Sequence, residues 1–348
     1  MPSKSFTYFY TAYTLATLPA WLVAVTIYNI PKFLRPNAAW SYKKAYTCNL
    51  LIVLNPQKSI TTTTEEGQEQ TESEVYKGIT HSVPGVEPVP VGAIWFPKVP
   101  SEPPRRLIIH FHASAYVMFG SRPGETADVG ISELSKVSGW PALSIEYRLS
   151  RDKKTTFPAA LQDGITAYVY ALEVLKIPAS RIAFAGDSAG GNLVLALLRY
   201  IKEENPALPL PRCAVLVSPW VDLSTKSIED LPLNRNYNTD YIKQDFLEWG
   251  RKAYTPEGWD SNNSWMTFLG NETRLGIPVF LSTGTSEVLY DDNLKYVENL
   301  REKGDEVELL ETPLSCHMPY QLGKDWGQEE DQAVCVKTIA KFLEKTGE

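Results

Sequence analysis

The chain has 348 residues, of which 43% are hydrophobic and 22% charged, a composition typical of globular proteins. Its 41 acidic residues outnumber the 34 basic ones, the net charge is -7, and no basic stripe interleaved with aromatic residues is present, which argues against nucleic acid as a partner. The four cysteines match neither a zinc site nor a disulfide scaffold, so we expect no metal and no cofactor.

The N-terminal segment 7–30 contains no charged residue over a length that would cross a bilayer. A cleaved signal peptide is disfavoured, because Lys4 is the only early charge and no small-residue cleavage site follows. Two interpretations stay open: a helix that spans a membrane or lies on its surface, and cap helices folded over an active site. If the segment spans a membrane, the basic residues that follow it favour a catalytic part on the cytoplasmic side. The expected localisation is therefore cytoplasmic or associated with the endoplasmic-reticulum membrane.

Three regions are predicted along the chain: an apolar segment and cap at 1–57, an exposed polar loop at 58–74, and a catalytic domain at 75–348. In the third region, short β-branched runs alternate with helical patterns, which indicates a mostly parallel sheet with helices on both faces. The predicted strands are 91–96, 106–112, 142–148, 181–186, 214–218, 278–284 and 307–312. The predicted helices are 158–175, 189–204, 290–303 and 330–345.

Residues 221–275 interrupt this alternation. They contain several tryptophans and turn signals instead of one crossover helix. We expect them to form a cap insertion over the carboxyl ends of the strands, where open α/β sheets bind their ligands.

A G-x-S-x-G motif lies in the run GDSAGG at 186–191, between a predicted strand and a predicted helix. Strand, tight turn and helix in this order are typical of a nucleophile elbow, which predicts Ser188 as the nucleophile. The alternative is a glycine-rich turn that binds a dinucleotide or a phosphate, but the sequence motifs of both are absent.

A nucleophilic serine needs a base, and the base needs a carboxylate to orient it; in this fold they follow in the order serine, acid, histidine. His317 is the only histidine after Ser188, so we expect it to be the base rather than a structural hydrogen-bonding residue. Glu287 is the first carboxylate after the sixth predicted strand and is the expected acid. Asp291 and Asp292 are alternatives, although both suit the first turn of the next helix.

The second predicted strand leads into the run HASAY at 112–116. Backbone amides in such a loop, together with the amide after the nucleophile, commonly stabilise an oxyanion. The amides expected in this role are those of Ala113, Ser114, Ala115 and Ala189. We also expect Tyr116 and Asp187 to border the bound substrate.

These motifs resemble the hormone-sensitive-lipase-like branch of the α/β-hydrolases. GDSAGG matches completely, and the similarity extends through YRL at 147–149, FPAALQD at 157–163, SPW at 218–220 and EVLYD at 287–291. The resemblance implies the α/β-hydrolase fold and hydrolysis of carboxylic esters with short or medium acyl chains, or bulky alcohol parts, beneath a cap. Some relatives are membrane-anchored steryl-acetate deacetylases, and others serve secondary metabolism.

The chain departs from that family at two points. HASA replaces HGGG, which adds side chains and is expected to exclude backbone angles that glycine adopts readily. Glu287 replaces the usual aspartate. The predicted function is hydrolysis of a hydrophobic small-molecule ester through an acyl-enzyme. One alternative is a different reaction on a natural-product intermediate, namely cyclisation, C–C cleavage or acyl transfer. The other alternative is a non-catalytic small-molecule receptor. No feature of the sequence indicates an oligomeric state.

Overall fold

The computed structural model describes residues 75–122, 126–323 and 326–346. Seven strands form one sheet in the order β1-β3-β2-β4-β5-β6-β7. All pairs of neighbours are parallel except β1 with β3. The strands are β1 Gly92–Phe96, β2 Leu107–Phe111, β3 Ala142–Glu146, β4 Ile182–Asp187, β5 Cys213–Val217, β6 Val279–Gly284 and β7 Val307–Thr312. Each of them overlaps a predicted strand.

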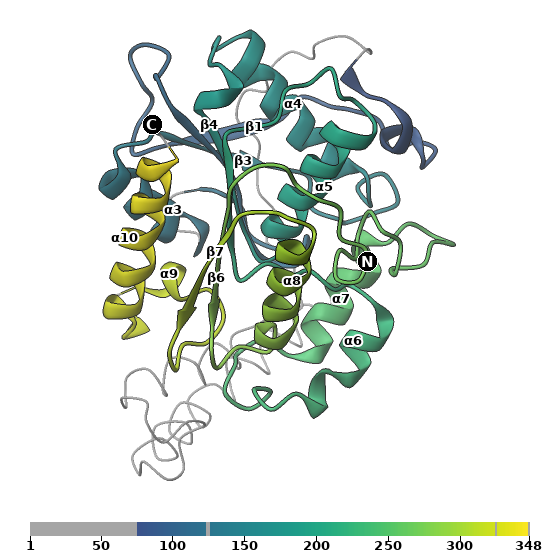
Figure 1. Cartoon of the computed structure of the whole chain (residues 1–348). Helices are drawn as coiled ribbons and strands as arrows, with labels where there is room; N and C mark the ends of the chain where they lie inside the picture. Colours follow the sequence, from purple (N-terminus) through teal and green to yellow (C-terminus); the bar gives the residue numbers. More distant parts are fainter. Residues whose placement is uncertain (1–74, 123–125, 324–325, 347–348) are drawn as a thin grey trace, which may run out of the picture.

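Helices cover both faces of the sheet, with α3 and α10 on one side and α4, α5 and α8 on the other (Figure 1). The central strands supply apolar side chains to both faces: in β4, Phe184 packs into one core cluster and Ala183 into the other. This two-sided burial is the reason that the strand sequences read as continuous apolar runs. The longer helices are α3 Thr126–Ser138, α4 Ala159–Glu173, α5 Ala189–Glu203, α8 Tyr290–Glu302 and α10 Glu329–Lys345.

Helix α3 is the one of these five that the sequence did not predict. Gly130 lies in its interior, and a glycine at such a position disfavours a helix. The structure explains the glycine, because a Cβ there would lie 2.7 Å from the ring of Tyr320. Tertiary packing against that ring therefore overrides the local preference.

Residues 221–275 pack on loops at the carboxyl ends of the strands. A Cβ at Gly250 in α7 would lie 2.5 Å from the carbonyl oxygen of Ala115, so α7 touches the loop after β2. The ring of Tyr254 stacks on that of Tyr116 with centroids 3.7 Å apart. The elements of this insertion are α6 Thr225–Asp230, the 3-10 helix η5 Leu231–Leu233 and α7 Gln244–Tyr254. Shorter elements elsewhere are η3 Gly78–His81, η4 Ala179–Arg181 and α9 Pro319–Leu322.

The predicted segments 1–57 and 58–74, with the uncharged run 7–30, lie outside the described residues. Among the residues that are described, no helix combines the length and the apolar character needed to cross a membrane.

Candidate active site

Ser188 occupies a tight turn between β4 and α5. Its backbone angles, φ 52° and ψ -113°, are strained for a residue with a side chain, and such strain is typical of functional sites. Two glycines permit the turn: a Cβ at Gly190 would lie 1.9 Å from the carbonyl oxygen of Phe111, and one at Gly186 would lie 2.2 Å from that of Gly190. The amide of Ser188 donates to the carbonyl oxygen of Val217 at 2.9 Å, which ties the turn to β5.

His317 and Glu287 meet in the loops that follow β7 and β6. Nδ1 of His317 lies 3.4 Å from Oε2 of Glu287, and both side chains are buried. Oε1 of Glu287 also accepts hydrogen bonds from Thr283 Oγ1 and, at 3.2 Å, from Asn293 Nδ2. Burial opposes the charged form of His317, but the carboxylates of Glu287, Asp240 and Asp187 outweigh it and raise the pKa of His317.

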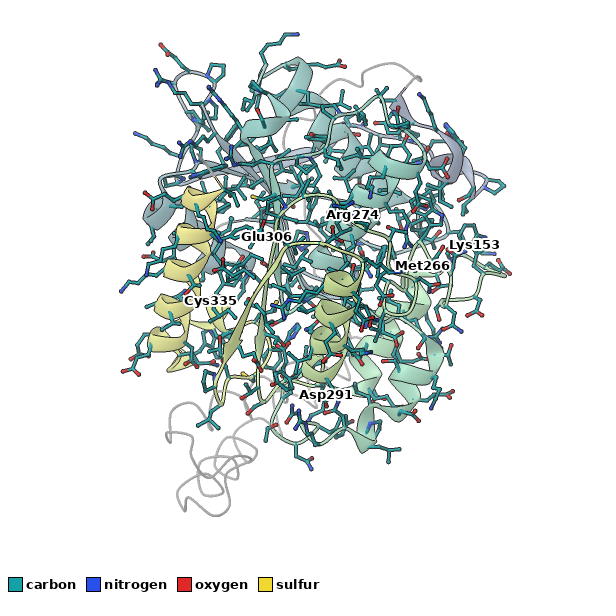
Figure 2. The ribbon with its side chains drawn as sticks, viewed as in Figure 1. Lys153, Met266, Arg274, Asp291, Glu306 and Cys335 are labelled. Carbon is teal, nitrogen blue, oxygen red and sulfur yellow. The ribbon has the colours of Figure 1, made fainter. Side chains whose placement is uncertain are left out.

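The two alternative acids lie elsewhere. Asp291 is exposed on α8, at the periphery of the molecule, and pairs with Arg235 at 2.6 Å (Figure 2). Asp292 borders a surface hollow that Asp222 and Ser227 also line, and burial raises its pKa to about 6. Of the three candidate carboxylates, the structure brings Glu287 to His317.

Ser218, in the SPW run, connects Glu287 to the loop that carries His317. Its hydroxyl donates to Oε2 of Glu287 at 2.7 Å and accepts from the amide of Met318 at 3.1 Å. Ser218 also has a positive φ of 45°. Ser218 belongs to the SPW run that carries part of the family similarity, but no role was predicted for it from the sequence.

Asp240, from the insertion, binds the backbone of the two loops that carry Glu287 and His317. Its Oδ2 accepts from the amide of Val288 at 2.8 Å, and its Oδ1 accepts from the amide of His317 at 3.3 Å. Next to it, the hydroxyl of Tyr241 donates to the carbonyl oxygen of His317 at 3.1 Å. Asp240 is fully buried, and this burial raises its pKa to about 6. Sequence reasoning missed Asp240, because it lies in an irregular insertion and outside any motif.

The loop after β2 adopts glycine-like backbone angles without glycine. The φ angles are 95° at Ser114, 51° at Ala115 and 65° at Tyr116. The expectation that HASA would exclude such angles is therefore wrong. Neighbouring contacts hold the strained loop: the carbonyl oxygen of Ser114 accepts from the amide of Val117 at 3.0 Å, and that of Tyr116 accepts from the amide of Ser150 at 2.7 Å.

The predicted oxyanion amides lie in this loop and at the start of α5. In the part of the chain that the structure describes, the amides of Ser114 and Ala115 donate to no backbone carbonyl. The amide of Ala189 opens α5, where the first amides of a helix have no partner within the helix. A helix N-terminus also favours negative charge nearby. These groups have the character that an oxyanion site requires, and the role of Ala113, Ser114, Ala115 and Ala189 stays a prediction.

Tyr116 and Asp187 have buried side chains with protein partners. The hydroxyl of Tyr116 donates to Oδ1 of Asn192 at 2.8 Å. The carboxylate of Asp187 contacts Nε2 of His110 at 2.8 Å and accepts from the hydroxyl of Tyr320 at 2.8 Å. Substrate contact by these two residues stays a prediction; the structure places Asp187 in a polar network beneath the elbow.

Glycine at the two strained loop positions is expected to stabilise the protein. A residue with a Cβ in the left-handed region costs about 1–2 kcal/mol of folding free energy, and glycine removes this cost. Part of the gain is offset, because glycine has more conformational freedom in the unfolded chain. Ser114→Gly/Ala115→Gly should therefore raise the free energy of unfolding by about 1 kcal/mol in denaturant titrations. Ala113→Gly is the matched control: φ is not positive at Ala113, so this change should lower the same quantity. A loss of stability in the double variant would contradict the assigned strain.

Comparison with known proteins gives the family. A family model described as the alpha/beta hydrolase fold matches residues 108–321, a range that spans β2 to α9 and includes all three predicted catalytic residues. The chain belongs to the α/β-hydrolase family. This confirms the predicted fold class.

The similar proteins include esterases and hormone-sensitive lipases. An acetyl-hydrolase from Streptomyces hygroscopicus is 27% identical over 223 residues, which are 63% of this chain and 70% of that protein. Hormone-sensitive lipase from Homo sapiens is 38% identical over 92 residues, 26% of this chain and 8% of the lipase. A solved hormone-sensitive lipase from a metagenome library has a TM-score of 0.61 and 27% identity, covering 79% of this chain and 88% of that one. These matches confirm the resemblance to the hormone-sensitive-lipase-like branch and support the predicted class, a carboxylic ester hydrolase.

Proposed function

We propose that this α/β-hydrolase cleaves carboxylic esters of hydrophobic small molecules through an acyl-enzyme on Ser188. The observation that carries the proposal is the buried contact between Glu287 and His317 at the sheet edge where Ser188 occupies its strained turn. A carboxylate that orients a histidine supplies the base needed for acyl transfer, and in the proposal this base acts on Ser188. The esterases among the similar proteins support the same class of reaction.

In the proposed reaction, His317 takes the hydroxyl proton of Ser188 as Oγ attacks the ester carbonyl carbon. The carbonyl π electrons move to oxygen, and the amides of the HASA loop and of Ala189 stabilise the resulting negative charge. The C–O bond to the alcohol then breaks, and His317 returns the proton to the leaving oxygen. Water repeats the sequence on the acyl-enzyme, with His317 again as base, and releases the acid and Ser188.

The packing of the insertion supports a hydrophobic substrate. Its aromatic side chains lie next to the loop after β2: Tyr254 stacks on Tyr116, and Phe157 contacts both Tyr254 and Trp259. The rings of Tyr116, Phe157 and Tyr254 are fully buried, so they make the surroundings of the HASA loop apolar. We therefore expect a substrate with a substantial apolar part.

Labelling and turnover together test the proposal. A fluorophosphonate probe should label the protein at Ser188, and p-nitrophenyl esters of short and medium acyl chains should be hydrolysed with a burst of p-nitrophenol that reports the acyl-enzyme. Labelling without turnover of any simple ester would contradict hydrolysis and favour acyl transfer to another acceptor. Labelling at a different residue would contradict the nucleophile.

The pH dependence of activity should report the charges around His317. The base acts only when neutral, so kcat/KM should fall as the pH decreases through the pKa of His317, with a midpoint above 6.5 because neighbouring carboxylates raise that pKa. Asp240→Asn removes one of these charges and should move the midpoint to lower pH. It also places an amide group among the backbone donors of Val288 and His317, and should lower kcat by about 10-fold or more.

The matched control is Asp245→Asn, in the exposed first turn of α7. It should leave both the midpoint and kcat unchanged. If Asp240→Asn lowers only stability and leaves the midpoint of the wild-type profile in place, Asp240 does not act on His317.

A further inference from the structure

Four arginines line one hollow at the edge of the sheet where the parallel strands begin. The hollow has a volume of about 510 Å³ and is lined by Arg105, Arg106, Arg181 and Arg212. Ser188 follows the other end of β4, so the hollow and the proposed ester site are separated by the length of the sheet. Neither the proposed reaction nor the family motifs use these residues.

The topology of the sheet brings three of them side by side. Arg106, Arg181 and Arg212 each directly precede a strand, and these strands, β2, β4 and β5, are neighbours in the sheet and parallel. Neighbouring strands lie about 4.8 Å apart, so the three backbone positions form a row along one edge. Arg105 adds a fourth positive charge beside Arg106.

The four guanidinium groups have no acidic partner within the described residues. None of the ion pairs there includes them, although the whole chain has 41 acidic residues against 34 basic ones. Arg212 donates one hydrogen bond, from Nη1 to the carbonyl oxygen of Ser180 at 2.7 Å, while its Nε is buried without a partner. Like charges on adjacent strands destabilise a sheet, so an unbalanced row of this kind favours a bound anion.

We propose that this hollow binds a phosphoryl group that carries at least two negative charges, in a phosphomonoester or a diphosphate. The planar guanidinium group donates paired hydrogen bonds that match phosphate oxygens, and several arginines together suit a multiply charged anion. The volume lies in the range of small-molecule sites and exceeds what a monatomic anion needs. Binding here stabilises the folded protein and takes place apart from ester turnover.

Pyrophosphate is the probe for a soluble ligand, and vesicles of phosphatidylcholine with or without phosphatidic acid are the probe for a lipid headgroup. Calorimetry at physiological ionic strength should detect binding of pyrophosphate if the ligand is soluble. Co-sedimentation should detect binding to vesicles that depends on phosphatidic acid if the ligand is a lipid headgroup. Arg105→Gln/Arg181→Gln should weaken the observed binding by at least about tenfold, since each guanidinium contributes charge-assisted hydrogen bonds. The side chains of these two exposed arginines make no hydrogen bond or ion pair with other described residues, so the fold should persist.

Arg235→Gln is the matched control, because Arg235 is an exposed arginine that pairs with Asp291. It should bind the probe as the wild type does. The proposal is overturned if neither probe binds, if the double variant retains wild-type affinity, or if Arg235→Gln loses as much affinity as the double variant. Ester turnover of the double variant should equal that of the wild type. A failure of the anion-binding proposal is therefore distinguishable from a failure of the proposed ester hydrolysis.

Discussion

Replacing Ser188 by alanine is expected to lower kcat for ester hydrolysis by about 10⁵- to 10⁶-fold. The side chain supplies the attacking oxygen, and alanine leaves only the contributions of substrate binding and of the oxyanion amides. Because the residues of a triad act as a unit, His317→Ala should cost about as much, and the double variant little more than either single one. Single-turnover kinetics with a p-nitrophenyl ester measure all three.

Ser264→Ala provides the comparison for this series, because Ser264 is an exposed serine of the insertion. It should retain wild-type kcat. Additive losses in the Ser188→Ala/His317→Ala variant would mean that the two residues act independently, and turnover in Ser188→Ala above a hundredth of the wild-type value would exclude Ser188 as the nucleophile.

Replacing Glu287 by glutamine is expected to lower kcat by about 10⁴-fold with a small effect on KM. Three side chains donate to the Glu287 carboxylate and Nδ1 of His317 lies 3.4 Å from it, so every neighbour requires an acceptor there. Glutamine presents an amide group to one of these donors or to the histidine, which favours the wrong tautomer of the base. Glu287→Asp should recover part of the loss, because the charge remains but the shorter side chain no longer reaches His317.

Glu298→Gln is the control for this substitution, since Glu298 is exposed on α8 and pairs with Lys295. It should leave kcat unchanged. The pH profile separates orientation from simple packing: loss of the Glu287 charge should lower the pKa of His317 and move the low-pH midpoint of kcat/KM downward. An unchanged midpoint in Glu287→Gln would exclude the assigned pairing.

Local patterns in the sequence predicted the strands, the turn at Ser188 and the chain order of the candidate catalytic residues. Short runs of strand length predicted all seven strands. In the central parallel strands β2, β4, β5 and β6 both faces are buried, and the apolar run itself records that burial. GDSAGG predicted the turn at Ser188, because the close approach of Gly190 to the loop after β2 allows no side chain. His317 followed by elimination, since no other histidine comes later in the chain.

Only the tertiary structure decided the contacts between distant segments. It selected Glu287 over Asp291, and it showed Asp240 bonded to the amides of Val288 and His317, 48 and 77 residues further along the chain. Tertiary contacts also hold the HASA loop at positive φ angles that its composition disfavours. Such features depend on which loops the folded sheet brings together, and a local pattern of hydrophobic and turn residues carries no record of that.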